Sequence, residues 1–353
     1  MTNPSSIQMT FQQPAAHAKW SFVTRRVNRE EAIRLLPHPE EAGNGDLILA
    51  EVTQIGSHKR LQLSDGRFSP LWPGDRIVVA CADRFAADQF EGHARLKDGG
   101  ADLLAGGGVA GEVISKNGRI ARATRLSVVG RLAGPEGTAL NLSNYSLPAI
   151  KPRQAPLLIG VLGTGMNAGK TAAAAGLVNG FARLGKRVAA IKATGTGAFG
   201  DVHEYEAAGA AQVLDFTDTG MASTYRQPLD RVQSAIDLLI SHAADCEVGV
   251  IELADGVSQV ETAALLSLPN WAARFDGLVL AAPDAMAAQG GLAWLGARGL
   301  TPIALSGLMT RAPICVAEAE ATGLPVFDRH VLADPATASA LTGIIANSKQ
   351  SAA

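Results

Sequence analysis

A glycine-rich segment near the middle of the chain constrains the fold more than any other feature. It has the sequence Gly163-Thr164-Gly165-Met166-Asn167-Ala168-Gly169-Lys170-Thr171, follows an apolar run and precedes an alanine-rich stretch with helical periodicity. A strand, a glycine-rich turn and a helix in this order are the context that a phosphate-binding loop requires. In such a loop, backbone N–H groups and the positive end of the helix face an anion. The alternative is a turn that only packs a helix on a strand, and the complete context favours phosphate binding.

The last two residues of this segment carry its chemistry. Lys170 would reach the β- and γ-phosphates of a nucleotide, and the hydroxyl of Thr171 would ligate Mg²⁺. All nine residues from 163 to 171 are therefore predicted to bind nucleotide. The strict phosphate-loop pattern has glycine where this chain has Thr164; here the glycine stands one position earlier, at Gly163.

The apolar runs after residue 156 predict a parallel sheet. They occupy 157–162, 188–191, 248–251, 278–281, 303–305 and 326–327, with helical patterns between them, for example over Leu229–His242. Short strands that are buried on both faces and alternate with helices are typical of a doubly wound, mostly parallel sheet. We therefore expect an α/β fold in which residues 151–353 form a P-loop nucleotide-binding domain.

The first 150 residues have a different pattern. Residues 1–44 predict a leader with one short helix over 29–36, which Asn28 would cap and Pro37 would end. From residue 45 to 150, short alternating segments between glycine turns predict a smaller β-rich N-terminal domain, barrel- or sandwich-like. The segment 151–156 contains two prolines and is expected to form a hinge. The sequence assigns no role to the β-rich domain.

Composition narrows the function classes. The 353 residues are 47% hydrophobic and 18% charged, which indicates a globular chain. A net charge of −2 and an aromatic content of 5% argue against a nucleic-acid-binding surface. The three cysteines, Cys81, Cys246 and Cys315, are too far apart for a zinc motif or a disulfide framework. Since no apolar run reaches the about 18–20 residues of a membrane helix and no signal-peptide pattern opens the chain, we expect a cytoplasmic protein without nucleic-acid or membrane partners.

Two loops of the second half carry candidate substrate-binding residues. The loop after the second parallel strand begins with Thr194, Gly195 and Thr196, and it would face substrate or phosphate, or else form a flexible connection. Arg226 lies in a polar segment and could clamp a substrate carboxylate with its planar guanidinium. A surface arginine at the rim of a turn is the slightly favoured alternative for Arg226.

The form Gly-Thr-x-x-x-x-Gly-Lys-Thr resembles the phosphate loop of dethiobiotin synthetase and of the cobyrinic acid amide synthetases. It looks unlike the dimeric partition and arsenite-pump ATPases, whose additional signature lysine would fall at Thr164. The segment 251–256, Ile-Glu-Leu-Ala-Asp-Gly, is similar to the Val-Glu-Gly-Ala-Gly-Gly segment of dethiobiotin synthetase. The resemblance implies a P-loop fold of that type and a homodimer.

The same resemblance implies roles for four more residues. Lys192, at the end of the second parallel strand, would contact phosphate and substrate and would act with Lys170 on the transferred phosphoryl group. Asp201 and Glu252 would ligate Mg²⁺, and Thr310 would lie beside the nucleotide base. The alternatives are a turn-forming role for Asp201 and a helix-capping role for Glu252. The implied activity is that of an Mg-ATP-dependent ligase, which phosphorylates a carboxylate-bearing small molecule so that an amine can form an N–C bond.

A second resemblance covers about 157–330 and leads to a different activity. The segments 193–197, Ala-Thr-Gly-Thr-Gly, and 213–216, Val-Leu-Asp-Phe, are similar to the P-loop family that includes D-glutamate N-acetyltransferases. That family has a Glu-Gly-Gln-Gly-Ser-type run where this chain has Glu252-Leu253-Ala254-Asp255-Gly256. The resemblance implies an N-acyltransferase that uses acetyl-coenzyme A on an amino acid. A third alternative is a nucleotide-switched maturation factor or chaperone ATPase, with the β-rich domain as its partner-binding module.

Overall fold

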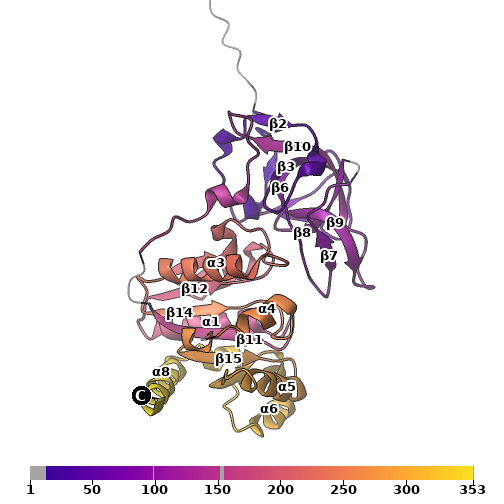
Figure 1. Cartoon of the computed structure of the whole chain (residues 1–353). Coiled ribbons are helices and arrows are strands. Elements are labelled where there is room, and N and C mark those ends of the chain that lie inside the picture. The colour runs from indigo at the N-terminus through magenta and orange to yellow at the C-terminus, as the bar shows by residue number, and fades with distance from the viewer. Residues whose placement is uncertain (1–12, 98, 152–154, 270, 353) are drawn as a thin grey trace, which may run out of the picture. The chain divides into compact units, whose positions relative to one another are not determined.

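The chain divides into two compact units in the computed structural model, which describes residues 13–97, 99–151, 155–269 and 271–352 (Figure 1). The first unit consists of Met1–Asp83 and Gln89–Tyr145, and the second of Arg84–Asp88 and Ser146–Ala353. The short segment Arg84–Asp88 thus lies inside the first unit in the sequence but belongs to the second unit by its contacts.

The first unit is a β-structure built around a closed ring of strands. Its strands are β1 (Lys19–Trp20), β2 (Arg34–Leu36), β3 (Leu47–Gln54), β4 (Arg60–Gln62), β5 (Phe68–Pro70), β6 (Arg76–Cys81), β7 (Phe90–His93), β8 (Gly100–Ala105), β9 (Val109–Lys116) and β10 (Thr124–Ala133). Strands β6, β3, β10, β8 and β9 pair in this order, and β9 pairs with β6, which closes the ring. Alternate residues of β3, namely Ile48, Ala50 and Val52, lie in its apolar core. The predicted barrel-like, β-rich architecture is confirmed.

The expected helix over residues 29–36 is wrong. The side chain of Asn28 does accept a hydrogen bond from the backbone N–H of Glu30, but it caps only a 3₁₀ turn over Arg29–Glu31. The following residues Arg34–Leu36 form β2, which pairs antiparallel with the end of β10. Ladder hydrogen bonds to an existing sheet thus outweigh the short helical pattern. The predicted leader also supplies β1, which pairs with β6.

The second unit has a six-stranded parallel sheet in the order β13-β12-β14-β11-β15-β16. Its strands are β11 (Leu157–Gly163), β12 (Val188–Lys192), β13 (Gln212–Asp215), β14 (Val248–Glu252), β15 (Gly277–Ala281) and β16 (Ala304–Ser306). Its helices are α1 (Lys170–Arg183), α2 (Phe199–Ala207), α3 (Leu229–His242), α4 (Val260–Leu266), α5 (Ala285–Gly296), α6 (Pro313–Glu320), α7 (Arg329–Leu332) and α8 (Pro335–Ala352). The 3₁₀ turns among the described residues are η1 (Phe22–Thr24), η2 (Arg29–Glu31), η3 (Pro39–Glu41), η4 (Leu142–Tyr145), η5 (Phe216–Thr219), η6 (Ala272–Arg274) and η7 (Leu308–Arg311).

Helices cover both faces of this sheet, so the predicted doubly wound α/β fold is confirmed. One apolar core contains side chains from α1, α2, α7 and α8, and the other contains side chains from α3, α4, α5 and α6. Figure 1 shows β12, β14, β11 and β15 in the order in which they pair. Strands buried on both faces explain the continuous apolar runs in the sequence.

Two strand assignments differ from the expectation. The edge strand β13 was not predicted, because only Val213 and Leu214 are apolar between Gln212 and Asp215. The apolar pair Val326 and Phe327 makes only an isolated bridge to Leu305. Of the described helices, none has both the length and the apolar character needed to cross a membrane.

Candidate phosphate-binding site

The glycine-rich segment connects β11 to α1 and has the backbone of an anion-binding loop. Asn167 and Gly169 adopt left-handed conformations with φ of 63° and 96°. Gly169 immediately precedes α1, and no side chain of the described residues caps that end of the helix. The first N–H groups of a helix have no partner within it, and they carry its positive dipole end. The structure therefore presents an uncapped helix N-terminus, preceded by the turn that the sequence predicts.

Small residues allow this loop to pack closely against its neighbours. A Cβ atom on Gly163 would lie 2.8 Å from the Lys170 side chain, and one on Gly256 would lie 2.8 Å from Gly165 Cα. Gly307 lies just after β16, and a Cβ on Gly169 would lie only 2.9 Å from its Cα. The loop is therefore enclosed by the ends of β14 and β16.

We expect Gly307→Ala to destabilise the second unit strongly. Gly307 has a φ of 106°, and its Cβ would lie 2.3 Å from the carbonyl oxygen of Ala168. Left-handed strain alone costs about 1–3 kcal/mol, and the backbone clash adds to it. The matched control is Gly290→Ala in α5, where nothing lies within 4 Å of the new Cβ and helix propensity predicts about 0.5–1 kcal/mol of stabilisation. Urea unfolding of both variants measures this, and equal stability would contradict the predicted role of Gly307.

Lys170 lies folded over the loop. Its side chain is buried, and Nζ donates hydrogen bonds to the carbonyl oxygens of Gly165, at 2.9 Å, and Asp255, at 2.7 Å. Burial lowers the pKa of Lys170. Because carbonyl oxygens are neutral, they compensate a buried ammonium less well than phosphate oxygens would.

Four residues that the sequence singled out converge beside Lys170. Lys192 Nζ lies 2.6 Å from Asp201 Oδ2 and 2.8 Å from Glu252 Oε1. The Thr171 hydroxyl donates to Asp201 Oδ1 at 3.1 Å and lies 3.4 Å from Glu252 Oε1. Lys192 and Glu252 end the adjacent strands β12 and β14 and are register partners, while Asp201 lies in the first turn of α2. We call Thr171, Lys192, Asp201 and Glu252 the ionic cluster.

Burial and charge act in opposite directions within the ionic cluster. Burial would lower the pKa of Lys192, but Asp201 and Glu252 raise it above its ordinary value. Burial would raise the pKa of Asp201, but Lys192 lowers it. Lys192 and Asp201 are therefore charged at neutral pH.

One member of this network was missed in the sequence. The hydroxyl of Tyr205 donates to Glu252 Oε2, and burial, followed by the Glu252 charge, raises the Tyr205 pKa well above its ordinary value. Tyr205 lies four residues after Asp201 in α2, so both side chains point from the same face of that helix. The four-residue spacing between Asp201 and Tyr205 is the sequence signal that could have identified Tyr205.

We expect the contribution of Asp201 to stability to disappear in acid. Since its folded pKa is lowered, this contribution is fully present above the unfolded pKa of about 3.9 and is lost as pH falls through the folded pKa. Urea unfolding of the wild type and Asp201→Asn between pH 7 and pH 3 should show a difference that shrinks below about pH 4. Asp230→Asn is the matched control, because it also removes a carboxylate from the first turn of a helix, α3, but leaves the ionic cluster unchanged. A constant difference for Asp201→Asn would contradict the assignment.

The oxygen atoms of the ionic cluster fit Mg²⁺. Two carboxylates and a hydroxyl are the hard ligands that Mg²⁺ prefers, and this ion usually retains several waters. Thr171, Asp201 and Glu252 could hold it together with phosphate oxygens, whereas Lys192 now lies between the two carboxylates. Within the described part of the chain, no group of three or more His, Cys, Asp or Glu side chains is placed to hold a metal ion. A metal at this position would therefore depend on the nucleotide for part of its coordination.

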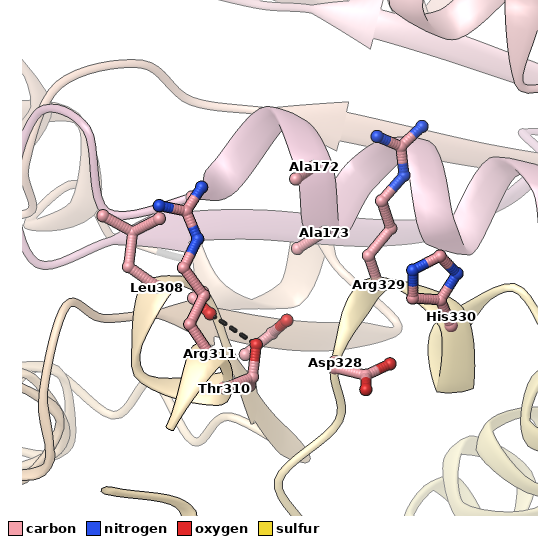
Figure 2. A pocket seen from close by; sticks show the side chains of 11 residues that line it. Ala172, Ala173, Leu308, Thr310, Arg311, Asp328, Arg329 and His330 are labelled. Carbon is pink, nitrogen blue, oxygen red and sulfur yellow. Dashed lines mark hydrogen bonds between the residues drawn. The ribbon is translucent and has the colours of Figure 1, made fainter. Parts of the chain in front are cut away.

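A pocket of about 310 Å³ opens beside the start of α1 (Figure 2). Its lining residues come from the start of α1, the end of β16 with η7, and the start of α7: Gly169, Ala172, Ala173, Ser306, Gly307, Leu308, Thr310, Arg311, Asp328, Arg329 and His330. Figure 2 shows the guanidinium groups of Arg311 and Arg329 on either side of the small residues Ala172 and Ala173. The Thr310 hydroxyl donates to the carbonyl oxygen of Gly307 at 2.7 Å. Such a volume lies at the lower end of the range for small-molecule sites.

The predicted substrate loop is well ordered by hydrogen bonds. The Thr194 hydroxyl accepts from the backbone N–H of Ala254 at 2.8 Å, and Gly195 N–H donates to the Thr224 hydroxyl at 2.9 Å. Thr196 forms an isolated antiparallel bridge to Ser223. A cavity lined by Thr194 and Thr224 measures only about 10 Å³, which is far too small for a substrate. Hydrogen bonds thus join this loop to the neighbouring segments at Ser223, Thr224 and Ala254.

The predicted clamp residue Arg226 lies in the segment just before α3. Arg226 is exposed, has a left-handed φ of 58°, and its backbone N–H donates to Glu261 Oε1 at 2.8 Å. The residues that line the 310 Å³ pocket other than Thr310 and Gly169 were not among the predicted site residues. They come from the start of α1, from the end of β16 with η7, and from the start of α7, and the latter two segments contain no motif that marks a pocket.

No family model matches the chain, and no curated protein matches it. The solved structures similar to it include the signal recognition particle 54 kDa protein from Aeropyrum pernix K1 in complex with GDP, with 18% identity, a TM-score of 0.36, and coverage of 57% of this chain and 49% of that chain. Another is the hydrogenase maturation factor HypB from Archaeoglobus fulgidus, with 10% identity, a TM-score of 0.35, and coverage of 54% and 90%. A third is the signal recognition particle receptor FtsY from Elizabethkingia anophelis, with 18% identity, a TM-score of 0.32, and coverage of 52% and 66%. This chain spans about half the length of the first of these proteins, and likenesses of this extent do not assign an activity.

Proposed function

We propose that the second unit binds the Mg²⁺ complex of a nucleoside triphosphate and transfers its γ-phosphoryl group to a carboxylate-type acceptor. We expect the nucleotide to be ATP. The observation that supports the proposal most is the ionic cluster beside the uncapped N-terminus of α1. A loop that only packs a helix on a strand has no need for a buried lysine, a buried and a half-buried carboxylate, and a hydroxyl at the same place.

The phosphates would occupy the loop between β11 and α1. Backbone N–H groups of the loop and the start of α1 would bind the β-phosphate. Lys170 Nζ, which now donates to two carbonyl oxygens, would turn to the β- and γ-phosphates and neutralise part of their charge. Thr171, Asp201 and Glu252 would hold Mg²⁺, whose charge would neutralise part of the phosphate charge.

The nucleoside would occupy the 310 Å³ pocket. This pocket shares Gly169 and Gly307 with the walls of the loop, so a phosphate chain at the start of α1 leads directly into it. Thr310 lines the pocket, in agreement with the expectation that it lies beside the base. Arg311 and Arg329 also line the pocket, and the Arg329 guanidinium forms an ion pair with Glu204 at 2.6 Å.

Lys192 would serve the acceptor side of the reaction. Its Nζ is already held between two carboxylates, and an acceptor carboxylate near it would share the same positive charge. An acceptor oxygen attacks the γ-phosphorus, the bond to the β–γ bridging oxygen breaks, and the nucleoside diphosphate leaves with that oxygen. An amine then attacks the acyl carbon of the mixed anhydride, which releases inorganic phosphate and a proton and forms the N–C bond.

Two alternatives use the same loop differently. Coenzyme A would bind its phosphates there, but its acyl transfer needs no metal, so it leaves Asp201 and Glu252 without a function. A nucleotide-switched maturation factor or chaperone would transfer the phosphoryl group to water, and the same loop and cluster would serve it. The ligase and the switch differ in whether turnover depends on an organic acceptor.

A trapping experiment tests the proposal. Full-length protein is incubated with Mg-ATP, hydroxylamine and a panel of small carboxylates, and hydroxamate and ADP are measured. The proposal predicts that one class of carboxylate yields hydroxamate and ADP in equal amounts. ADP formation that no carboxylate stimulates would favour the switch, and the absence of ADP formation together with binding of acetyl-coenzyme A would contradict phosphoryl transfer.

A further inference from the structure

The segment Arg84–Asp88 contacts the phosphate-binding loop through Asp88 and carries an arginine, Arg84. In the sequence it connects β6 to β7, yet its contacts group it with the second unit. Asp88 Oδ2 accepts a hydrogen bond at 3.1 Å from Nδ2 of Asn167, which is itself a loop residue with a left-handed backbone. The ring of Phe85 packs on that of Tyr225, with 5.6 Å between centroids. These contacts fix the segment against the glycine-rich loop.

Arg84 is a buried charge in this segment. Its side chain is among the few charged side chains in the described residues that are almost fully buried, with 6% relative exposure. Its guanidinium interacts electrostatically with Asp88 and with Asp255, and burial lowers its pKa to about 10, so it is charged at neutral pH. An arginine is costly to bury unless other charged groups compensate it.

Asp255 connects Arg84 to the catalytic lysines. The carbonyl oxygen of Asp255 accepts from Lys170 Nζ, and its carboxylate interacts electrostatically with Lys170, Lys192 and Arg84. The next residue, Gly256, has its Cα so close to Gly165 that a Cβ there would clash. Arg84, Lys170 and Lys192 therefore all interact electrostatically with one carboxylate, that of Asp255. A triphosphate bound at the loop would bring more negative charge than the single carboxylate of Asp255.

We propose that Arg84 contacts the transferred γ-phosphoryl group and stabilises the charge that develops on it, acting in cis from the segment Arg84–Asp88. The inference rests on the proposed nucleotide binding and adds a residue to it. On binding of the triphosphate, the guanidinium exchanges its interaction with Asp255 for one with phosphate oxygens. An arginine that supplies charge to a phosphoryl group in the transition state accelerates transfer by about 10³–10⁵.

The expected signature separates catalysis from binding. A residue that contacts only the γ-phosphoryl group affects turnover strongly and affinity for a nucleoside diphosphate hardly at all. In Arg84→Ala we expect ATP turnover to fall by at least about 100-fold, with ADP affinity within about threefold of the wild type. Added guanidinium ion should restore part of the turnover, which a purely structural arginine would not allow. Arg84→Lys should bind ADP normally and stay well below wild-type turnover, because an ammonium cannot reproduce the planar fork.

The matched control is Arg231→Ala. Arg231 is a partly buried arginine of α3 whose guanidinium donates to Gln227 Oε1 and to the carbonyl oxygen of Gly220, away from the loop. It should change neither turnover nor ADP affinity by more than about threefold. The experiment uses the full chain, with ATP turnover measured by ADP release and ADP binding by calorimetry. If Arg84→Ala does not fold, Arg84→Lys decides by the same two measurements.

The outcomes distinguish the inference from the proposed function. Wild-type turnover that persists in the Arg84 variants overturns the inference alone. A parallel loss of turnover and ADP affinity also overturns it, because Arg84 then acts on the loop as a whole. If the wild type and the Arg231 variant neither bind nor turn over ATP, the proposed function fails and the inference fails with it.

Discussion

Lys170→Ala is expected to weaken the binding of Mg-ATP by about 10- to 150-fold. A hydrogen bond to a charged group contributes about 1.5–3 kcal/mol, and each 1.4 kcal/mol changes a dissociation constant tenfold. The fold should persist, because Lys170 Nζ donates only to two backbone carbonyl oxygens and the variant removes a buried, desolvated charge. Calorimetric titration with Mg-ATP measures the affinity, and circular dichroism with urea unfolding measures the fold.

Lys186→Ala is the matched control for this variant. Lys186 follows α1 and forms an exposed ion pair with Glu247, at 2.8 Å. Its loss should leave nucleotide affinity unchanged and cost at most about 1 kcal/mol of stability. Equal affinity of Lys170→Ala and the wild type for Mg-ATP would contradict the assignment of residues 163–171 as a phosphate-binding loop.

Lys192→Met is expected to cause the largest loss of stability. Lys192 Nζ is the cation between Asp201 and Glu252, and the Glu252 side chain is 1% exposed. Removing one partner of a buried ion pair leaves an uncompensated buried charge and costs about 3–5 kcal/mol. Without the lysine, the remaining carboxylates should have raised pKa values, so the variant should gain stability relative to the wild type as pH falls from 8 to 5.

The double variant Lys192→Met/Glu252→Gln separates charge from packing. Neutralising Glu252 removes the uncompensated charge while keeping the hydrogen bond from Tyr205 available. We expect urea unfolding at pH 7 to show that the double variant recovers more than half of the stability lost in Lys192→Met. If the single variant loses less than about 1 kcal/mol, as an exposed pair would, the ionic cluster is not the buried network described here.

Most residues of the candidate site could be predicted from the sequence because they lie at the ends of parallel strands. Lys192 and Glu252 each end an apolar run, and the carboxyl ends of adjacent parallel strands meet at one edge of a sheet. The bounds of α3, Leu229–His242, were also predictable, since its apolar positions repeat with a helical period. Such local patterns predict the structure well because apolar side chains at these spacings are buried on one face of the element.

The remainder depends on contacts between distant residues. The helical pattern over 29–36 yields to pairing between β2 and β10, which lie about a hundred residues apart in the chain. The pocket lining around Asp328 and the position of Arg84–Asp88 depend likewise on segments that only the folded chain brings together. The sequence of those segments contains no periodicity or motif from which such contacts could be predicted.

Calorimetric titration of the wild-type protein tests the central claim most directly. The ligands are ATP with Mg²⁺, ATP with a chelator, and acetyl-coenzyme A. The proposed function predicts binding of ATP that requires Mg²⁺ for full affinity, and no binding of acetyl-coenzyme A. Binding of acetyl-coenzyme A without metal dependence would contradict it, and would mean that the loop serves acyl transfer and that Asp201 and Glu252 are not metal ligands.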